Sequence, residues 1–146
     1  MRRNIFRVSS EDLLKIGDVY LVEFEGEGSE QRGIRPAVIF QNNIGNAYSP
    51  NVVVLPLTTA LKKKDLPTHV ELPAKETGLV KDSMVLCENP VCISKRKLGK
   101  YLTTVPDKFM EKIAVASLLA SSVISFMSPE LLLATRECAK KINCRG

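Results

Sequence analysis

The residues best suited to chemistry are an arginine and a threonine, each next to an apolar run. Arg35 stands directly before Pro36, which restricts the backbone of Arg35 to the extended region. The run 37–40 is typical of a buried strand, so we expect Arg35 at its first rung, beside a polar loop. A guanidinium held there presents several N–H donors in one plane, which suits it to bind a phosphate. Thr58 ends the second run, 51–57. The simpler interpretation is a surface ion pair at Arg35 and a strand-end cap at Thr58.

Other reactive side chains form weaker patterns. His69 is the single histidine and lies in a strand beside Glu71, so we interpret it as a structural or surface residue. The glutamates of 23–30 alternate out of a strand into a loop, which favours a solvated face. No cysteine belongs to a C-x-x-C pair, so we expect no zinc site, no other metal and no cofactor. The four cysteines are Cys87, Cys92, Cys138 and Cys144.

The amino-acid composition limits the classes to which this protein can belong. The 146 residues are 45% hydrophobic and 25% charged, typical of one globular domain. The net charge of +5 favours a polyanionic partner. The N-terminus lacks the apolar run of a secretory signal, and we expect reduced thiols in the cytoplasm. The uncharged segment 113–127 is shorter than the ~20 residues that cross a bilayer, so a buried or interface helix is expected.

Many short apolar runs separated by turns, then two helical segments, predict a mainly β protein with C-terminal helices. Capping residues 9–12 predict a short helix before the first strand. We expect strands at 18–24, 36–41, 51–57, 68–72, 82–88 and 100–105. A helix should start at Pro106, with Phe109, Ile113, Ala116, Leu119 and Ala120 on one face, and a second at Ser128.

Several short motifs recur in one order, and together they resemble the MazF/PemK toxins, the ribonuclease partners of type II toxin–antitoxin pairs. The motifs are Gly17-Asp18-Val19-Tyr20, Gly33-Ile34-Arg35-Pro36, Gln41-Asn42, Pro56-Leu57-Thr58 and Leu66-Pro67-Thr68-His69-Val70. The resemblance covers residues 17–126 and implies a small SH3-like β-barrel, as in MazF, PemK and CcdB. Residues 1–16 would then be an N-terminal extension, and residues 127–146 a C-terminal helical extension.

The resemblance implies that Arg35 and Thr58 are catalytic and that the fold brings their strand ends together. It implies a sequence-specific, metal-independent endoribonuclease that cleaves single-stranded RNA to 2′,3′-cyclic phosphate and 5′-hydroxyl ends. In this reaction Arg35 would stabilise the pentacoordinate phosphorane, and Thr58 would donate to a phosphoryl oxygen. A homodimer, packed near the 113–126 helix, and a cognate acidic antitoxin protein are implied as partners.

The resemblance also assigns substrate-binding residues to loops around the same groove. Two departures bear on the recognised RNA sequence: Asn89 replaces a glutamine common in the family, and 90–92 replaces a stretch that usually holds an arginine. The alternatives are a barrel that binds nucleic acid or peptide without cutting, and a CcdB-like gyrase poison. Arg35 and Thr58 together favour the nuclease. The implied substrate-binding residues are Ser29, Glu30, Gln31, Leu66, Pro67, Ser83, Glu88 and Asn89.

Overall fold

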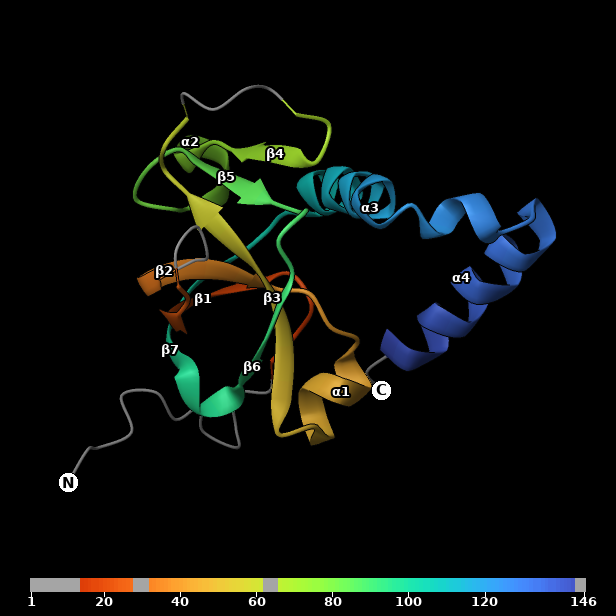
Figure 1. The fold of residues 1–146 in the computed structure, drawn as a ribbon, viewed down its shortest axis with the longest axis horizontal. Coiled ribbons are helices and arrows are strands. Elements are labelled where there is room, and N and C mark those ends of the chain that lie inside the picture. Colours follow the sequence, from red (N-terminus) through yellow and green to blue (C-terminus); the bar gives the residue numbers. More distant parts are fainter. Residues whose placement is uncertain (1–13, 28–31, 62–65, 144–146) are drawn as a thin grey trace.

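The computed structural model describes residues 14–27, 32–61 and 66–143, and within them seven strands form one antiparallel sheet (Figure 1). The strand order is β4-β5-β3-β2-β1-β7, and β6 pairs with β3 off this path. The sheet is strongly curved but does not close into a barrel, so the predicted class is confirmed and the SH3-like description fits broadly. The strands are β1 (Asp18–Glu25), β2 (Arg32–Ile39), β3 (Asn51–Thr58), β4 (His69–Leu72), β5 (Ser83–Leu86), β6 (Val91–Ser94) and β7 (Leu98–Thr104).

The longer helices follow the sheet in the chain. In Figure 1, α3 lies beside β4 and β5, whereas α4 stands apart from the sheet and approaches α1 at its C-terminal end. There the Asn43 backbone N–H donates to Asn143 Oδ1 over 2.9 Å. No helix in the described part of the chain is long and apolar enough to cross a membrane. The helices are α1 (Asn43–Tyr48), α2 (Ala74–Thr77), α3 (Asp107–Ser121) and α4 (Pro129–Asn143), with 3-10 turns η1 (Lys95–Lys97) and η2 (Val123–Phe126).

The central strands bury both faces, which explains their nearly continuous apolar runs. Alternate residues point to opposite sides of a strand, so β1 sends Val19 to one core cluster and Tyr20 to another. The first cluster lies under α3, which contributes the fully buried Ile113. The second fills the side lined by β6 and β7 and includes Leu14 and Phe24. Residues 37–39 of β2 are therefore packed on both faces of the sheet.

The structure corrects several predicted boundaries. β2 begins at Arg32, four residues earlier than predicted, and Arg35 lies within it instead of at its first rung. The segment predicted as a turn-rich connection contains α1, whose N-cap Asn42 accepts a hydrogen bond from the Gly45 N–H. β6 lies between the predicted strands 82–88 and 100–105, where no strand was predicted. Residues 11–13 of the predicted first helix lie outside the described residues, and Lys15 is not helical.

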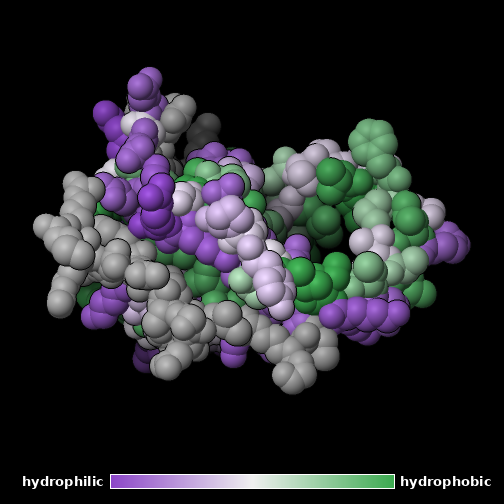
Figure 2. All heavy atoms as spheres, turned by 90° about the horizontal axis from the view of Figure 1, so that it is seen from below, coloured by the Kyte–Doolittle hydropathy of each residue, from purple (hydrophilic) through white to green (hydrophobic). Residues whose placement is uncertain are grey.

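The apolar face predicted for α3 is only partly right. Phe109, Ile113 and Ala116 are buried as predicted, whereas Leu119 and Ala120 are exposed because α3 extends beyond the sheet. Figure 2 shows hydrophobic residues gathered on the side that carries the C-terminal helices. The exposed large apolar side chains of this region are Val115, Leu119, Val123, Phe126, Leu131, Leu132 and Leu133.

Candidate nucleic-acid site

Arg35 is an exposed side chain on a strand that is otherwise fixed by its neighbours. It stands opposite Val22 of β1, whose side chain is fully buried. The Arg35 Nε donates to the Arg32 carbonyl oxygen over 2.8 Å, so the side chain is laid back along its own strand. Gly33, between them, has a φ of +81°, a conformation that glycine adopts without strain. Among the described residues the guanidinium has no other hydrogen-bond partner, so its two terminal nitrogens are open to an anion.

Thr58 is the last residue of β3 and is 9% exposed. Its Oγ1 accepts a hydrogen bond from the Ala60 N–H over 3.1 Å, which closes the turn after the strand. On its other side, Thr58 pairs with Met84 of β5. Because the hydroxyl oxygen accepts from the backbone, its own proton remains available to a phosphoryl oxygen.

The register of β2 and β3 relates these two residues. The paired residues are Ala37 with Pro56, Val38 with Leu55 and Ile39 with Val54. If this antiparallel register is followed two residues further, Arg35 comes opposite Thr58. Both residues therefore lie at the same end of the β2–β3 pair, where β3 leaves β2 to pair with β5.

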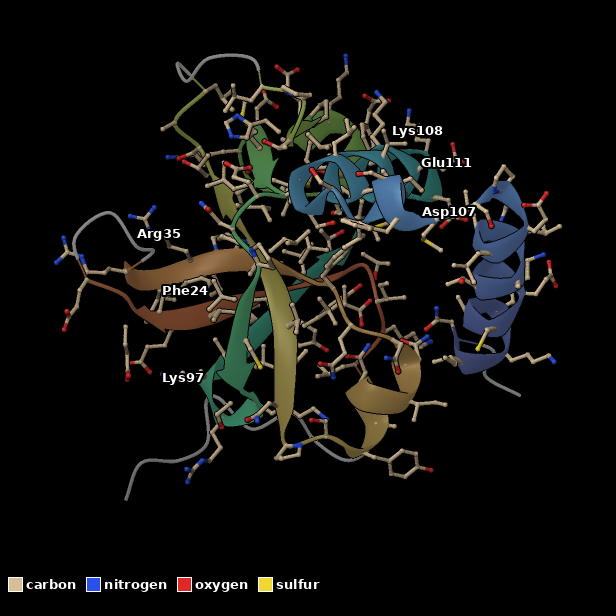
Figure 3. The ribbon with its side chains drawn as sticks, turned by 45° about the vertical axis from the view of Figure 1, so that its right-hand side comes forward. Phe24, Arg35, Lys97, Asp107, Lys108 and Glu111 are labelled. Atoms are coloured by element: carbon tan, nitrogen blue, oxygen red, sulfur yellow. The ribbon has the colours of Figure 1, made fainter. Side chains whose placement is uncertain are left out.

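A cleft of about 750 Å³ opens between the end of β1 and the β5–β6 connection. Phe24 lies at its wall, and Lys97 pairs with Glu25 across one side, with 3.0 Å between Nζ and Oε2. Figure 3 places Phe24, Lys97 and Arg35 on one side of the molecule and the labelled residues of α3 on the other. Glu88 and Asn89 also line this cleft.

The remaining predicted residues separate into groups. Leu66 and Pro67 are exposed and lie in the turn before β4, whose His69 pairs with Leu86 of β5. Pro67 also lines a second groove of about 480 Å³ between β4 and α3. Ser83 is buried at the opposite end of β5 from Glu88, and its hydroxyl donates to the Lys81 carbonyl over 3.0 Å.

Ser83 is thus next to Met84, the residue that pairs with Thr58. It does not line the cleft that contains Glu88 and Asn89. The rest of β5 and the turn at 87–88 separate Ser83 from Glu88, so the two side chains face different parts of the surface. Ser29, Glu30 and Gln31 lie outside the described residues.

Some cleft residues were not predicted from the sequence. Phe24 was predicted only as part of a strand, and Lys97 and Cys92 lie between the predicted strands 82–88 and 100–105. The alternation of Glu23 and Glu25 was interpreted as a solvated face, yet both line the cleft. The sequence does contain a signal for the strand β6, because the apolar triplet 91–93 follows Pro90 and lies within that strand.

The buried thiol next to Glu88 has no reactive character. Burial raises the pKa of Cys87 to about 11, so its thiol stays protonated near neutral pH. Burial also lowers the pKa of Lys95, whose ammonium donates to the Asn46 carbonyl oxygen over 2.5 Å. Among the described residues, no three His, Cys, Asp or Glu side chains gather as a possible metal site.

Comparison with known proteins gives a consistent result. Residues 15–119 match the model of the "PemK-like, MazF-like toxin of type II toxin-antitoxin system" family. Endoribonuclease EndoA of Bacillus subtilis is 39% identical over 115 residues, which cover 78% of this chain and 99% of that relative.

Solved structures agree with the fold. A mycobacterial endoribonuclease in complex with its cognate antitoxin superposes with a TM-score of 0.62 at 29% identity, over 75% of this chain and 96% of that one. MazF from Deinococcus radiodurans gives a TM-score of 0.66 at 20% identity, over 77% and 99% of the two chains, which supports the fold alone. The family match spans most of the chain, and the sheet carries Arg35 and Thr58 at one end of the β2–β3 pair. The chain therefore belongs to the PemK-like, MazF-like toxins of type II toxin–antitoxin systems.

Proposed function

We propose that this chain is the toxin of a type II pair and acts in the cytoplasm as a sequence-specific, metal-independent endoribonuclease on single-stranded RNA. The observation that carries the proposal is the common position of Arg35 and Thr58 at one end of the β2–β3 pair, in a chain of this family. The 39% identity with EndoA, across nearly the whole of that endoribonuclease, supports the same activity. The toxin domain comprises residues 17–126, between the extensions 1–16 and 127–146.

In the reaction, the ribose 2′-oxygen attacks the adjacent phosphorus. The bond from phosphorus to the 2′-oxygen forms and the bond to the 5′-oxygen breaks. The 2′-hydroxyl loses a proton and the leaving 5′-oxygen gains one. The products are therefore a 2′,3′-cyclic phosphate and a 5′-hydroxyl. Because RNA supplies its own nucleophile, the protein needs only to position the chain and to stabilise negative charge.

Arg35 stabilises the phosphorane through its terminal guanidinium nitrogens. Its Nε contact with the Arg32 carbonyl orients the guanidinium before RNA binds, and a donor oriented in advance does not have to reorganise during the reaction. Arginine stays protonated in proteins, so we assign it an electrostatic role and not that of a general base.

Thr58 donates a hydrogen bond from its hydroxyl to a phosphoryl oxygen. The Ala60 N–H occupies one lone pair of the hydroxyl oxygen and thereby orients the hydroxyl. A neutral donor stabilises an anion less than a charged donor does, so Thr58 contributes less than Arg35.

The rest of the RNA lies along the neighbouring surface. Proteins recognise single-stranded RNA through unstacked bases and backbone charge. Glu88 and Asn89, in the cleft, present acceptors and donors to base edges, while the exposed Leu66 and Pro67 pack against a base. Ser83 and the loop residues Ser29, Glu30 and Gln31 complete the proposed contacts.

Two protein partners complete the proposal. A cognate acidic antitoxin competes with RNA for the surface around Arg35, because carboxylates and phosphates are attracted by the same cations. A second copy of the chain covers the exposed apolar side chains of α3 and η2, such as Leu119 and Phe126. Light scattering at micromolar concentration should give the mass of a dimer, and the mass of a monomer would contradict this part.

The activity is tested by incubating the purified protein with a long RNA and mapping the new 5′ ends. We expect cuts at a short recurring sequence in excess EDTA, and no cuts in DNA of the same sequence. The Arg35→Ala variant, prepared in the same way, controls for a contaminating nuclease. Equal cleavage by that variant, or loss of all cleavage in EDTA, would contradict the proposed function.

A further inference from the structure

His69 lies where β4 meets the turn that follows β5, and its surroundings are unusual for a histidine. The side chain is 4% exposed, and its Nε2 lies 2.8 Å from Glu88 Oε1. The other ring nitrogen, Nδ1, is buried and has no hydrogen-bond partner among the described residues. A buried polar atom without a partner lowers stability, so the position of this ring needs a reason beyond folding.

The environment determines which nitrogen carries the proton. A carboxylate accepts hydrogen bonds, so Nε2 carries the hydrogen that points to Glu88. Nδ1 has no partner among the described residues, so the contact with Glu88 is the side-chain hydrogen bond that orients the ring.

The contact fixes the Glu88 side chain next to a backbone that is already held on both sides. The Cys87 N–H donates to the Thr68 carbonyl over 3.0 Å, and the Asn89 N–H donates to the Leu86 carbonyl over 3.1 Å. Glu88 lines the large cleft with its side chain 32% exposed. Within the described residues its second carboxylate oxygen has no hydrogen-bond partner, so this oxygen can accept from a ligand.

A carboxylate repels the phosphates of RNA, so its partner in the cleft must be a donor. The amino and imino groups on the Watson–Crick edge of an unstacked base are such donors. A carboxylate that could rotate freely would accept from donors in several places. One that is held through Oε1 presents Oε2 in a single position and discriminates between bases.

We propose that His69 is a positioning residue for RNA specificity: it holds Glu88 so that the free carboxylate oxygen selects a base with an amino or imino donor at one position of the cleavage sequence. This inference rests on the proposed ribonuclease function. The proposed effect of His69 on the RNA is exerted through Glu88 and not through contact with the reacting atoms. His69 lies one strand away from the cleft.

The test compares His69→Gln with His69→Asn in the full chain. The amide nitrogen of glutamine reaches the place of the histidine Nε2, whereas that of asparagine reaches the place of Nδ1. Both substitutions remove the ring, so they disturb packing similarly, but only glutamine can restore the donor to Glu88. Glu88→Ala identifies the affected base position, and Val70→Ala, a buried neighbour on β4, controls for loss of stability alone.

The readout is the rate of cleavage of RNAs in which each base of the cleavage sequence is varied in turn. We expect Glu88→Ala and His69→Asn to reduce discrimination at the same single position, on the order of 10-fold for one lost hydrogen bond to a charged group. The change should appear in KM for the preferred RNA more than in kcat. His69→Gln should retain most of the discrimination between bases. Val70→Ala should lower Tm without changing this discrimination.

Two results would overturn the inference while leaving the ribonuclease function intact. One is unchanged discrimination in His69→Asn; the other is a further loss in the His69→Asn, Glu88→Ala double variant beyond that of Glu88→Ala. If His69→Asn does not fold, the comparison of His69→Gln with Glu88→Ala decides, because a Gln variant as relaxed as Glu88→Ala contradicts the proposed contact. A wild-type protein that neither cuts nor binds RNA would refute the proposed function and this inference together.

Discussion

Two arginines of β2 allow the role of Arg35 to be separated from that of positive charge in general. Arg32 and Arg35 are both exposed on the same strand, and both carry one charge. Gly33 between them has a positive φ, and the Arg35 Nε lies 2.8 Å from the Arg32 carbonyl oxygen, so the two residues lie close together. The substitutions Arg35→Ala and Arg32→Ala therefore change the net charge equally, at nearly the same place.

The expected magnitudes differ because only Arg35 is proposed to contact the phosphate directly. Loss of a preorganised donor that contacts the developing charge typically costs 10²- to 10³-fold in rate, or about 2.7 to 4 kcal/mol, and we expect this for Arg35→Ala. Arg32 makes no direct contact with the phosphate in this proposal, so its charge acts through solvent and is screened by salt. Its removal should therefore slow cleavage only a few-fold.

Single-turnover cleavage of a labelled RNA at low and high salt distinguishes the two effects. The loss in Arg35→Ala should persist at high salt, because a direct contact excludes screening ions, whereas the loss in Arg32→Ala should fade. The Arg32 carbonyl that orients Arg35 survives substitution of its side chain, so Arg32→Ala leaves that contact intact. Equal losses in both variants, with equal salt dependence, would refute the catalytic role of Arg35.

Three further results are expected. Thr58→Ala should slow cleavage about 10-fold and Thr58→Ser much less, because serine keeps the hydroxyl donor; equal rates in the two variants would contradict the proposed role. Alkylation of the exposed Cys92 in the cleft should block RNA binding. The Cys92→Ser variant should still bind RNA after the same treatment, although its exposed Cys138 is modified. Continued binding by alkylated wild-type protein would show that RNA avoids this cleft. Burial raises the pKa of Cys87 from 9.0 to about 11, so above pH 9 the unfolded thiol ionises first and favours unfolding. The stability that Cys87 contributes should be complete below pH 9 and decline toward pH 11, and Cys87→Ala should lack this part of the decline in urea unfolding; identical pH dependence in the two proteins would contradict it.

The parts of the fold that were predicted correctly carry strong local signals. β1 and β3 are dense in β-branched and aromatic residues, and their predicted bounds agree with the structure to within one residue at each end. α4 begins after Ser128, whose hydroxyl accepts from the Leu131 N–H as a helix cap should. Such signals act within a few residues and do not depend on the rest of the chain.

The errors occur where tertiary contacts override local preference. α1 contains Asn43, Gly45 and Asn46, which disfavour helix, yet Asn46 is buried and donates to the Gln41 carbonyl over 2.8 Å. β6 has four residues and exists because β3 offers it a free edge. The exposure of Leu119 arises because α3 is longer than the strands it covers.

The candidate site was predicted from motifs and not from local pattern. Arg35 and Thr58 were assigned through the family resemblance, and their relation depends on a register that only the folded sheet determines. The contact between His69 and Glu88 joins residues 19 apart in the chain, and nothing in either segment alone indicates it. The catalytic and substrate-binding assignments stay predictions until variants are measured.

The central claim is that the RNA's own 2′-oxygen is the nucleophile and that protein side chains stabilise the resulting charge. Mass spectrometry of the products from one short RNA, cut in excess EDTA, tests this most directly. A second RNA lacks only the 2′-hydroxyl on the 5′ side of the cut. We predict a 2′,3′-cyclic phosphate and a 5′-hydroxyl from the first RNA and no cleavage of the second. Products with a 5′-phosphate and a 3′-hydroxyl, or cleavage of the second RNA at the same site, would contradict it.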